Sequence, residues 1–179
     1  VTEVAGKDGE FTVTLEDGTF STGKTVLITT GSSRRKLEVP GAVEYENKGI
    51  TYCASCDGPL FSGMDVVVVG GGNAGFESAA QLLAYCKSVT LLSRSEPRAD
   101  PITVEKLQSR EHFKLIVNAV PKSIQGSTFV ESITYTKTDT QEDITLPVSA
   151  VFVEIGQIPA VSFVEGVVAM NPVNHIIVD

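Results

Sequence analysis

Cysteine is scarce in this sequence, with three among 179 residues. A small secreted domain that depends on disulfides carries many more, so this number favours a reactive or metal-binding use. Positive charge is also limited, with 14 Lys and Arg against 22 Asp and Glu and a formal net charge of −8. Apart from the pair Arg34-Arg35 we find no basic cluster of the kind that binds nucleic acid, and we expect no nucleic-acid partner.

Long apolar runs are lacking as well. No stretch approaches the roughly 20 apolar residues needed to span a bilayer, so we expect no membrane segment. No signal peptide is evident, and because the chain begins with Val1 instead of Met we expect it to be a piece of a longer protein. With 42% hydrophobic and 20% charged residues, the composition is typical of a globular domain with a core of its own.

The most informative stretch is a run of four valines, Val66–Val69, followed directly by three glycines. Consecutive β-branched residues predict a strand that is buried on both faces, as in a parallel sheet. A helix is predicted over Phe76–Tyr85 and a second strand over Ser88–Leu92. The glycines therefore connect a strand to a helix within a βαβ unit.

Gly70, Gly72 and Gly75 have the G-x-G-x-x-G spacing of a dinucleotide-binding turn. The first glycine permits a tight turn, the second lets the backbone approach a pyrophosphate, and the third lets the helix lie close to the strand. The first N–H groups of the helix would then face the phosphates. The alternative is a glycine-rich turn that binds nothing. The predicted cofactor-binding turn comprises Gly70, Gly71, Gly72, Asn73, Ala74 and Gly75.

The rest of the chain predicts an α/β fold with a Rossmann-like parallel sheet. Apolar runs at Phe113–Ala119 and Ala150–Ile155 would extend the sheet, with a short helix over Ile102–Arg110. Pro121–Pro147 changes to a period of two, which indicates an antiparallel meander as the crossover. Arg34–Tyr52 shows little periodicity and is interpreted as a connector. Further β-rich segments are predicted at Glu10–Glu16, at Thr19–Ser21 after an Asp17-Gly18 turn, at Lys24–Thr30 and at Ile176–Val178.

Two of the cysteines form a Cys-x-x-Cys motif, Cys53-Ala54-Ser55-Cys56, with Asp57 directly after it. This spacing lets the two sulfurs close a disulfide and favours the thiolate form of one of them for exchange. The adjacent carboxyl group can pass a proton to or from a sulfur. We expect a reversible Cys53–Cys56 disulfide. Cys86 lies across a strand and a helix, and is expected to be a buried small hydrophobe more than a third catalytic thiol.

A zinc site is the alternative use of this cysteine pair. Structural zinc takes four ligands, usually from two close pairs. Cys86, His112 and His175 could complete such a set, but none of them is paired at ligand spacing. The residues alone leave three hypotheses open: a redox dithiol, a zinc-stabilised structural domain, and a nucleotide-binding regulatory module with inert cysteines.

Three segments resemble the low-molecular-weight thioredoxin reductases, and at least as closely the flavoprotein subunit of alkyl hydroperoxide reductase. They are Thr51–Phe61, Gly70–Asn73 and Ile155–Pro159, and the resemblance extends over nearly the whole chain. It implies an FAD domain that is interrupted by an NAD(P)H-binding domain carrying the dithiol.

The resemblance also implies domain boundaries. Residues 1–33 would be a partial FAD-domain segment, 34–158 the NAD(P)H-binding domain with Cys-x-x-Cys, and 159–179 the start of the return to the FAD domain. The family's FAD motifs lie outside these residues. We therefore expect FAD to be held by the longer protein and not by this chain alone.

A mechanism and a set of site residues follow from the same resemblance. NAD(P)H would reduce FAD, FAD would reduce the Cys53–Cys56 disulfide, and the dithiol would reduce a thioredoxin-like or peroxiredoxin-like protein. Cys56 would face the flavin, Cys53 would attack the partner, and Asp57 would act as the acid or base. Ile155 and Gly156 would complete the cofactor site. The full-length protein would be a cytoplasmic homodimer.

The type of nicotinamide nucleotide depends on the end of the second strand, where Ser93, Arg94 and Arg98 occur. NAD sites usually place an acidic residue there, whereas arginines favour the 2′-phosphate of NADPH. From the end of the second strand at Leu92, no acidic residue occurs until Glu96. We therefore expect NADPH, with NADH as the alternative if the arginines are merely solvated. Of the arginines that the thioredoxin reductases carry here, only Arg94 is in register. The hydroperoxide reductase flavoprotein has Glu where Ser93 stands.

Overall fold

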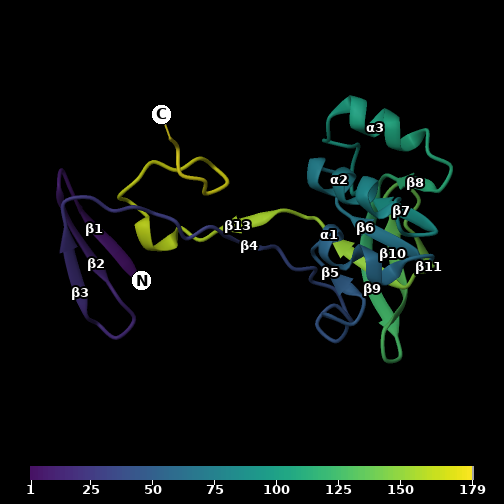
Figure 1. Ribbon diagram of the computed structural model, residues 1–179, viewed down its shortest axis with the longest axis horizontal. Coiled ribbons are helices and arrows are strands. Elements are labelled where there is room, and N and C mark those ends of the chain that lie inside the picture. The colour runs from purple at the N-terminus through teal and green to yellow at the C-terminus, as the bar shows by residue number, and fades with distance from the viewer. Residues whose placement is uncertain (179) are drawn as a thin grey trace. The chain divides into compact units, whose positions relative to one another are not determined.

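The computed structural model describes residues 1–178 (Figure 1). Its contacts divide the chain into two compact units, each described here by itself. The inner unit is Arg35–Gly156, and the outer unit combines Val1–Arg34 with the residues from Gln157 on. The chain thus leaves the outer unit once and returns to it. That the outer unit belongs to an FAD domain, with the boundaries given above, stays a prediction.

The inner unit is built on a five-stranded parallel sheet with the order β5-β12-β6-β7-β8. The strands are β5 (Ile50–Thr51), β6 (Asp65–Val69), β7 (Ser88–Leu92), β8 (Phe113–Ile116) and β12 (Ala150–Val153). The valine run forms the middle strand, and all four valines are buried. Successive side chains of a strand point to opposite faces, so a strand covered on both faces needs apolar residues at every position.

One face of the sheet packs against the helices α2 (Asn73–Leu82) and α3 (Pro101–Gln108). The buried side chains of this layer include Val66, Val68, Phe76, Leu107 and Phe152. The ring of Phe152 meets the ring of Phe61 edge to face, with the centroids 5.8 Å apart. The helices therefore cover the side of the sheet to which every second residue of β6 points.

The other face packs against an antiparallel meander of β9 (Ala119–Gly126), β10 (Val130–Lys137) and β11 (Glu142–Pro147). Val67 and Val69 of β6 lie in this layer with the β10 residues Ile133 and Tyr135. The meander connects β8 to β12, as the period of two predicts. The inner unit consequently has three layers, and the α/β fold class is confirmed.

The outer unit contains two small sheets. One is an antiparallel sheet of β1 (Glu3–Lys7), β2 (Glu10–Thr14) and β3 (Phe20–Gly23). The predicted turn at Asp17-Gly18 connects β2 to β3. In the other sheet β4 (Ser32–Arg34) pairs with β13 (Gln157–Pro159), which joins the two chain segments of this unit. A small core holds Val4, Val161 and Val164, the last in the short 3-10 helix η2 (Ser162–Val164).

Two predicted strands are wrong. Lys24–Thr30 has no regular structure, and Ile176–Val178 contributes only an isolated bridge between Met170 and Ile176. In the described residues no strand pairs with either segment, and their apolar side chains are at most half-buried against the small core. β-propensity alone does not form a strand without a partner and a surface to cover.

The element boundaries also differ from the predictions. α2 starts at Asn73, with Gly72 at its N-cap, and ends at Leu82. α3 starts at Pro101 because the Asp100 carboxylate accepts hydrogen bonds from the first N–H groups of the helix. The early start of α2 places its unpaired N–H groups directly at the glycine turn.

Two further segments change character. The predicted strand Phe113–Ala119 divides into β8 and the start of β9 at Asn118, whose φ is +56°. The connector Arg34–Tyr52 supplies the edge strand β5 and a buried Tyr45, whose hydroxyl donates to the Gly126 carbonyl oxygen at 2.7 Å. Tertiary contacts, not periodicity, give this segment its structure.

Replacing Phe152 by alanine tests the core. The ring is fully buried between sheet and helices, so Phe152→Ala should lower the free energy of unfolding by about 3–5 kcal/mol. Phe129→Ala is the matched control, because Phe129 is 61% exposed and its loss should change the free energy by about 0.5 kcal/mol or less. Urea denaturation followed by circular dichroism measures both. Equal effects would contradict this packing.

Candidate functional site

Two glycines of the turn between β6 and α2 are required by the fold itself. Gly70 has φ +137°, and a Cβ there would lie 2.1 Å from the carbonyl oxygen of Glu154. A Cβ at Gly75 would lie 1.9 Å from the carbonyl oxygen of Gly70. Only glycine satisfies the left-handed backbone at position 70 and the close approaches at both positions.

Gly72 differs from these two glycines. Its backbone is extended, with φ −94° and ψ −179°, and a Cβ there would meet no atom within 4 Å. Neither backbone conformation nor packing within the protein demands glycine at this position. Gly72 lines an open cleft, so the demand for glycine would come from a ligand that approaches the backbone.

The cleft has a volume of about 650 Å³ and lies at the carboxyl ends of β6, β7 and β12. Ten of the eleven residues predicted to bind the cofactor line it: Gly70, Gly71, Gly72, Asn73, Ala74, Ser93, Arg94, Arg98, Ile155 and Gly156. The eleventh, Gly75, is buried under the turn. Because β12 and β7 flank β6, the cleft lies where the strand order reverses, which is where open α/β sheets bind ligands. The structure brings these residues together, and their binding role stays a prediction.

Ser93 closes the base of this cleft. Its side chain is only 3% exposed, and its hydroxyl donates to the carbonyl oxygen of Ser95 at 2.6 Å. A Cβ at Gly71 would lie 2.0 Å from the same hydroxyl oxygen. Ser93 therefore supports the turn through packing, and the strand end supplies no acidic group of the kind that binds a ribose in NAD sites.

The loop after β7 is fixed to the glycine turn by two hydrogen bonds. The N–H of Arg98 donates to the carbonyl oxygen of Gly71 at 2.8 Å, and the N–H of Asp100 donates to Oδ1 of Asn73 at 2.8 Å. The side chains of Arg94 and Arg98 are exposed at the cleft. The loop thus presents positive charge next to the turn that would hold phosphates.

The cleft also contains residues that the sequence analysis did not assign to a cofactor site. They include Arg35, Leu37, Glu96, Ala119, Val120, Pro121 and Glu154. Arg35 and Leu37 lie in the segment interpreted as a connector, where no periodicity marked them. Glu154 immediately precedes the predicted Ile155, and it reaches the cleft because β12 pairs in parallel register with β6, which no pattern in the sequence indicates.

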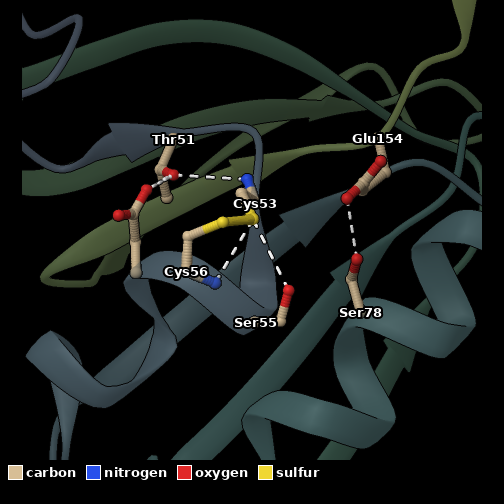
Figure 2. Close-up of a disulfide and its surroundings, with 7 residues drawn as sticks. Thr51, Cys53, Ser55, Cys56, Ser78 and Glu154 are labelled. Carbon is tan, nitrogen blue, oxygen red and sulfur yellow. Dashed lines mark hydrogen bonds between the residues drawn. A yellow bond between two sulfur atoms is a disulfide. The ribbon is translucent and has the colours of Figure 1, made fainter.

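The second part of the site is the Cys-x-x-Cys segment that follows β5 (Figure 2). Cys53 and Cys56 form a disulfide with their Cα atoms 5.3 Å apart, as predicted, and Cys86 is free and buried. Cys53 is the N-cap of the short helix α1 (Ala54–Asp57), and its sulfur accepts a hydrogen bond from the N–H of Cys56 at 3.2 Å. Cys56 is exposed and Cys53 is half-buried.

Burial raises the pKa of the Cys86 thiol to about 11. At neutral pH this thiol stays protonated, and the nucleophilic thiolate is scarce. Cys86 therefore has the predicted character of a buried small hydrophobe.

Thr51 ties the acid and the disulfide to the edge of the sheet. Its hydroxyl donates a hydrogen bond to the Asp57 carboxylate, and the N–H of Cys53 donates to the same hydroxyl oxygen at 3.4 Å (Figure 2). Thr51 is 8% exposed and belongs to β5. The sequence analysis missed this residue because a single threonine in a strand gives no signal of its own. Asp57 continues directly into the 3-10 helix η1 (Gly58–Phe61).

Within residues 1–178, no three side chains of His, Cys, Asp or Glu gather into a group that could hold a metal ion. In the same part of the chain, no helix combines the length and apolarity needed to cross a membrane.

The candidate site of this compact α/β unit thus comprises a cleft at the glycine turn and a disulfide at a neighbouring strand end. The family described as pyridine nucleotide-disulphide oxidoreductase matches residues 1–179, and the chain belongs to it. Enzymes of this kind use FAD and a pyridine nucleotide. The resemblance to thioredoxin reductases and the hydroperoxide reductase flavoprotein is confirmed at the level of the family. The zinc-stabilised domain and the regulatory module are not favoured.

Two known proteins illustrate the similarity in sequence. An NADH dehydrogenase of Bacillus subtilis is 41% identical over 170 residues, which cover 94% of this chain and 33% of that protein. The F subunit of an alkyl hydroperoxide reductase from Staphylococcus aureus is 37% identical over 179 residues, which cover 99% of this chain and 35% of that protein. The chain thus spans about a third of the length of these relatives.

Among solved structures, a Lactococcus lactis thioredoxin reductase superposes with a TM-score of 0.87 at 30% identity and covers 99% of this chain and 59% of that one. A T. acidophilum thioredoxin reductase gives a TM-score of 0.85 at 32% identity with the same coverage.

Alanine at Gly72 and at Gly75 separates binding from folding. Gly72→Ala should leave the free energy of unfolding within about 0.5 kcal/mol of the parent, because the new Cβ meets no protein atom. It should weaken NADPH binding, measured by calorimetry, at least about tenfold, because the Cβ would occupy the space in which we expect the pyrophosphate. Gly75→Ala is the control and should destabilise the fold by about 1–3 kcal/mol through its clash with Gly70. Unchanged NADPH affinity in Gly72→Ala would refute the assignment of the turn.

Proposed function

We propose that the chain is the NAD(P)H-binding, dithiol-bearing part of a flavin-dependent disulfide reductase of the thioredoxin reductase type. The observation that supports this proposal is one unit that carries both the Gly72-lined cleft and, at a neighbouring strand end, the Cys53–Cys56 disulfide. The longer protein would pass electrons from NADPH through FAD to this cysteine pair, and then to a thioredoxin-like or peroxiredoxin-like disulfide protein. It would act as a cytoplasmic homodimer.

The residues of the cleft suit a pyridine nucleotide. Gly72 leaves open space at the turn, and Asn73 and Ala74, the first residues of α2, line the cleft. The positive end of the helix dipole favours a phosphate there. Bound nucleotide and flavin would supply hydride and electron transfer. The protein residues would bind and orient the nucleotide and carry out the thiol–disulfide exchange.

The thiol chemistry would proceed as a two-electron exchange. The Cys53 thiolate attacks one sulfur of the partner's disulfide and expels the other as a thiolate, which takes up a proton. The Cys56 thiolate then attacks Cys53, re-forms the internal disulfide and releases the second partner sulfur, which is also protonated. Asp57, held by the Thr51 hydroxyl, is the group that would exchange protons with these sulfurs.

We propose NADPH as the nucleotide, because Arg94 and Arg98 are exposed in the cleft beside the turn. NADH is the second candidate, since the same loop carries Glu96, whose carboxylate could bind a ribose hydroxyl. The name of the Bacillus subtilis relative, NADH dehydrogenase, favours this candidate as well.

Removing both arginines decides between the nucleotides. If they bind the 2′-phosphate, Arg94→Ala/Arg98→Ala should cost NADPH roughly 1.5–3 kcal/mol of binding free energy for each charge-assisted hydrogen bond removed and leave NADH nearly unchanged. Calorimetric titration with both nucleotides measures the difference. Arg110→Ala, an exposed arginine just after α3, is the matched control and should change neither affinity. Equal losses for NADPH and NADH would show that the arginines do not discriminate.

Serine in place of Cys53 tests the electron path in the full-length enzyme. Cys53→Ser should abolish turnover of a protein disulfide but leave flavin reduction by NADPH intact, because only the exit of electrons needs the thiol. Stopped-flow bleaching of the flavin, together with steady-state turnover, separates the two steps. Cys86→Ala should retain both. Parent-like turnover in Cys53→Ser would exclude this path.

A further inference from the structure

Two hydrogen-bond donors converge on the sulfur of Cys53 (Figure 2). The backbone nitrogen of Cys56 lies 3.2 Å from this sulfur, and the hydroxyl oxygen of Ser55 lies 3.5 Å from it. A sulfur in a disulfide carries no hydrogen, so the Ser55 hydroxyl is the donor of the second bond. Among residues 1–178, no hydrogen bond reaches the sulfur of Cys56. The two sulfurs of the disulfide therefore have different surroundings.

This difference matters once the disulfide is reduced. Sulfur in a neutral group is a weak acceptor, whereas a thiolate is charged, and hydrogen bonds to charged groups are stronger. The two donors therefore favour a negative charge on Cys53 over one on Cys56. Reduction breaks the S–S bond and takes up two electrons, which the flavin of the proposed function would supply, and one proton. The reduced pair is then a Cys53 thiolate and a Cys56 thiol.

The charged groups around the cysteine pair do not supply this stabilisation. Asp57 ends α1, and α1 packs against η1, which has no charged residue, and against α2, whose charged residue is Glu77. Glu154 accepts a hydrogen bond from α2, and burial raises the pKa of the neighbouring Tyr52, which stays neutral at pH 7. The charged groups on these elements are acidic, so none of them offers positive charge to a Cys53 thiolate.

We propose that the Ser55 hydroxyl stabilises the Cys53 thiolate and thereby makes Cys53 the sulfur that holds the negative charge of the reduced pair. This inference rests on the proposed function, in which that thiolate attacks the disulfide of a partner protein. The N–H of Cys56 belongs to the backbone and is present in every variant, so the Ser55 hydroxyl is the donor that a substitution removes. Ser55 is exposed, and its replacement leaves the core unchanged.

The position of the first label in the reduced chain tests the location of the charge. The 179-residue chain is reduced with a phosphine and treated briefly with iodoacetamide at about pH 6, and tandem mass spectrometry locates the label. The label should enter Cys53 before Cys56, because the thiolate is the nucleophile. Accessibility alone gives the opposite order, since Cys56 is exposed and Cys53 is half-buried.

The reaction rate of Cys53 with a small disulfide tests the role of Ser55. Cys56→Ser serves as the background, so that Cys53 reacts alone, and dithiobis-nitrobenzoate is the probe. Loss of one hydrogen bond to a charged group in Ser55→Ala should lower the thiolate fraction about tenfold well below neutral pH. The less stabilised thiolate is about threefold more nucleophilic. Ser55→Ala should therefore react about threefold more slowly at about pH 6 and about threefold faster at about pH 10, where both proteins are ionised.

Two variants serve as controls in the same background. Ser55→Thr keeps the hydroxyl and should retain the parent rates within about twofold. Ser62→Ala removes an exposed hydroxyl that donates to the carbonyl oxygen of Tyr85, and should change neither rate.

Three results would overturn the inference. They are entry of the first label at Cys56, parent rates for Ser55→Ala at both pH values, and a change of its rate in the same direction at both, which would indicate altered access to the sulfur. The labelling and the probe need no nucleotide, flavin or partner protein. Failure of the proposed function, seen as absent NADPH binding or parent-like turnover in Cys53→Ser, is therefore distinguishable from failure of this inference.

Discussion

The close approach of Gly75 to the carbonyl oxygen of Gly70 determines how the inner unit is assembled. No side chain fits between α2 and the turn, so the helix starts directly at the end of β6. The same turn brings the backbone of Glu154 against Gly70, which aligns the ends of β12 and β6. The cleft, its helix N-terminus and the loop fixed by Arg98 all depend on this close packing. A larger residue at either glycine would therefore disturb the cleft through the fold and not only through weaker binding of a ligand.

The parallel sheet explains why two chemistries share one edge. In a parallel sheet all strands end on the same side, so the segments after β5, β12, β6 and β7 come together there. The segment after β5 carries the Cys53–Cys56 disulfide, and those after the other three strands form the cleft. Thr51 and Ser78 are buried hydroxyls that connect polar side chains of the site to this framework. Both halves of the site are thus positioned by one sheet, which fits membership in the pyridine nucleotide-disulphide oxidoreductase family.

Much of this arrangement could be predicted from the sequence because its signals are local. The valine run, the glycine spacing and the Cys-x-x-Cys motif each act over a few residues, and the structure has the expected strand, turn and disulfide at these positions. Contacts between distant segments left no comparable signal. Glu154 and Arg35 enter the cleft only through strand order, and Thr51 gains its role only because α1 places Asp57 beside it. Lys24–Thr30 is an error of the other kind, because a strand was predicted there and none forms. The segment has β-propensity, but no strand among the described residues pairs with it.

The most direct test of the central claim maps nucleotide binding on the chain residue by residue. Amide chemical shifts of the ¹⁵N-labelled chain would be followed during titration with NADPH. The account predicts the largest saturable shifts in the cleft, at Gly70–Ala74, Ser93–Arg98 and Glu154–Gly156. Smaller changes are expected in the Cys53–Asp57 segment, which follows β5, the strand next to β12. The outer unit should show no shifts of comparable size. An absence of saturable shifts, or shifts centred on any other surface, would contradict the claim that this unit binds a pyridine nucleotide at the glycine turn.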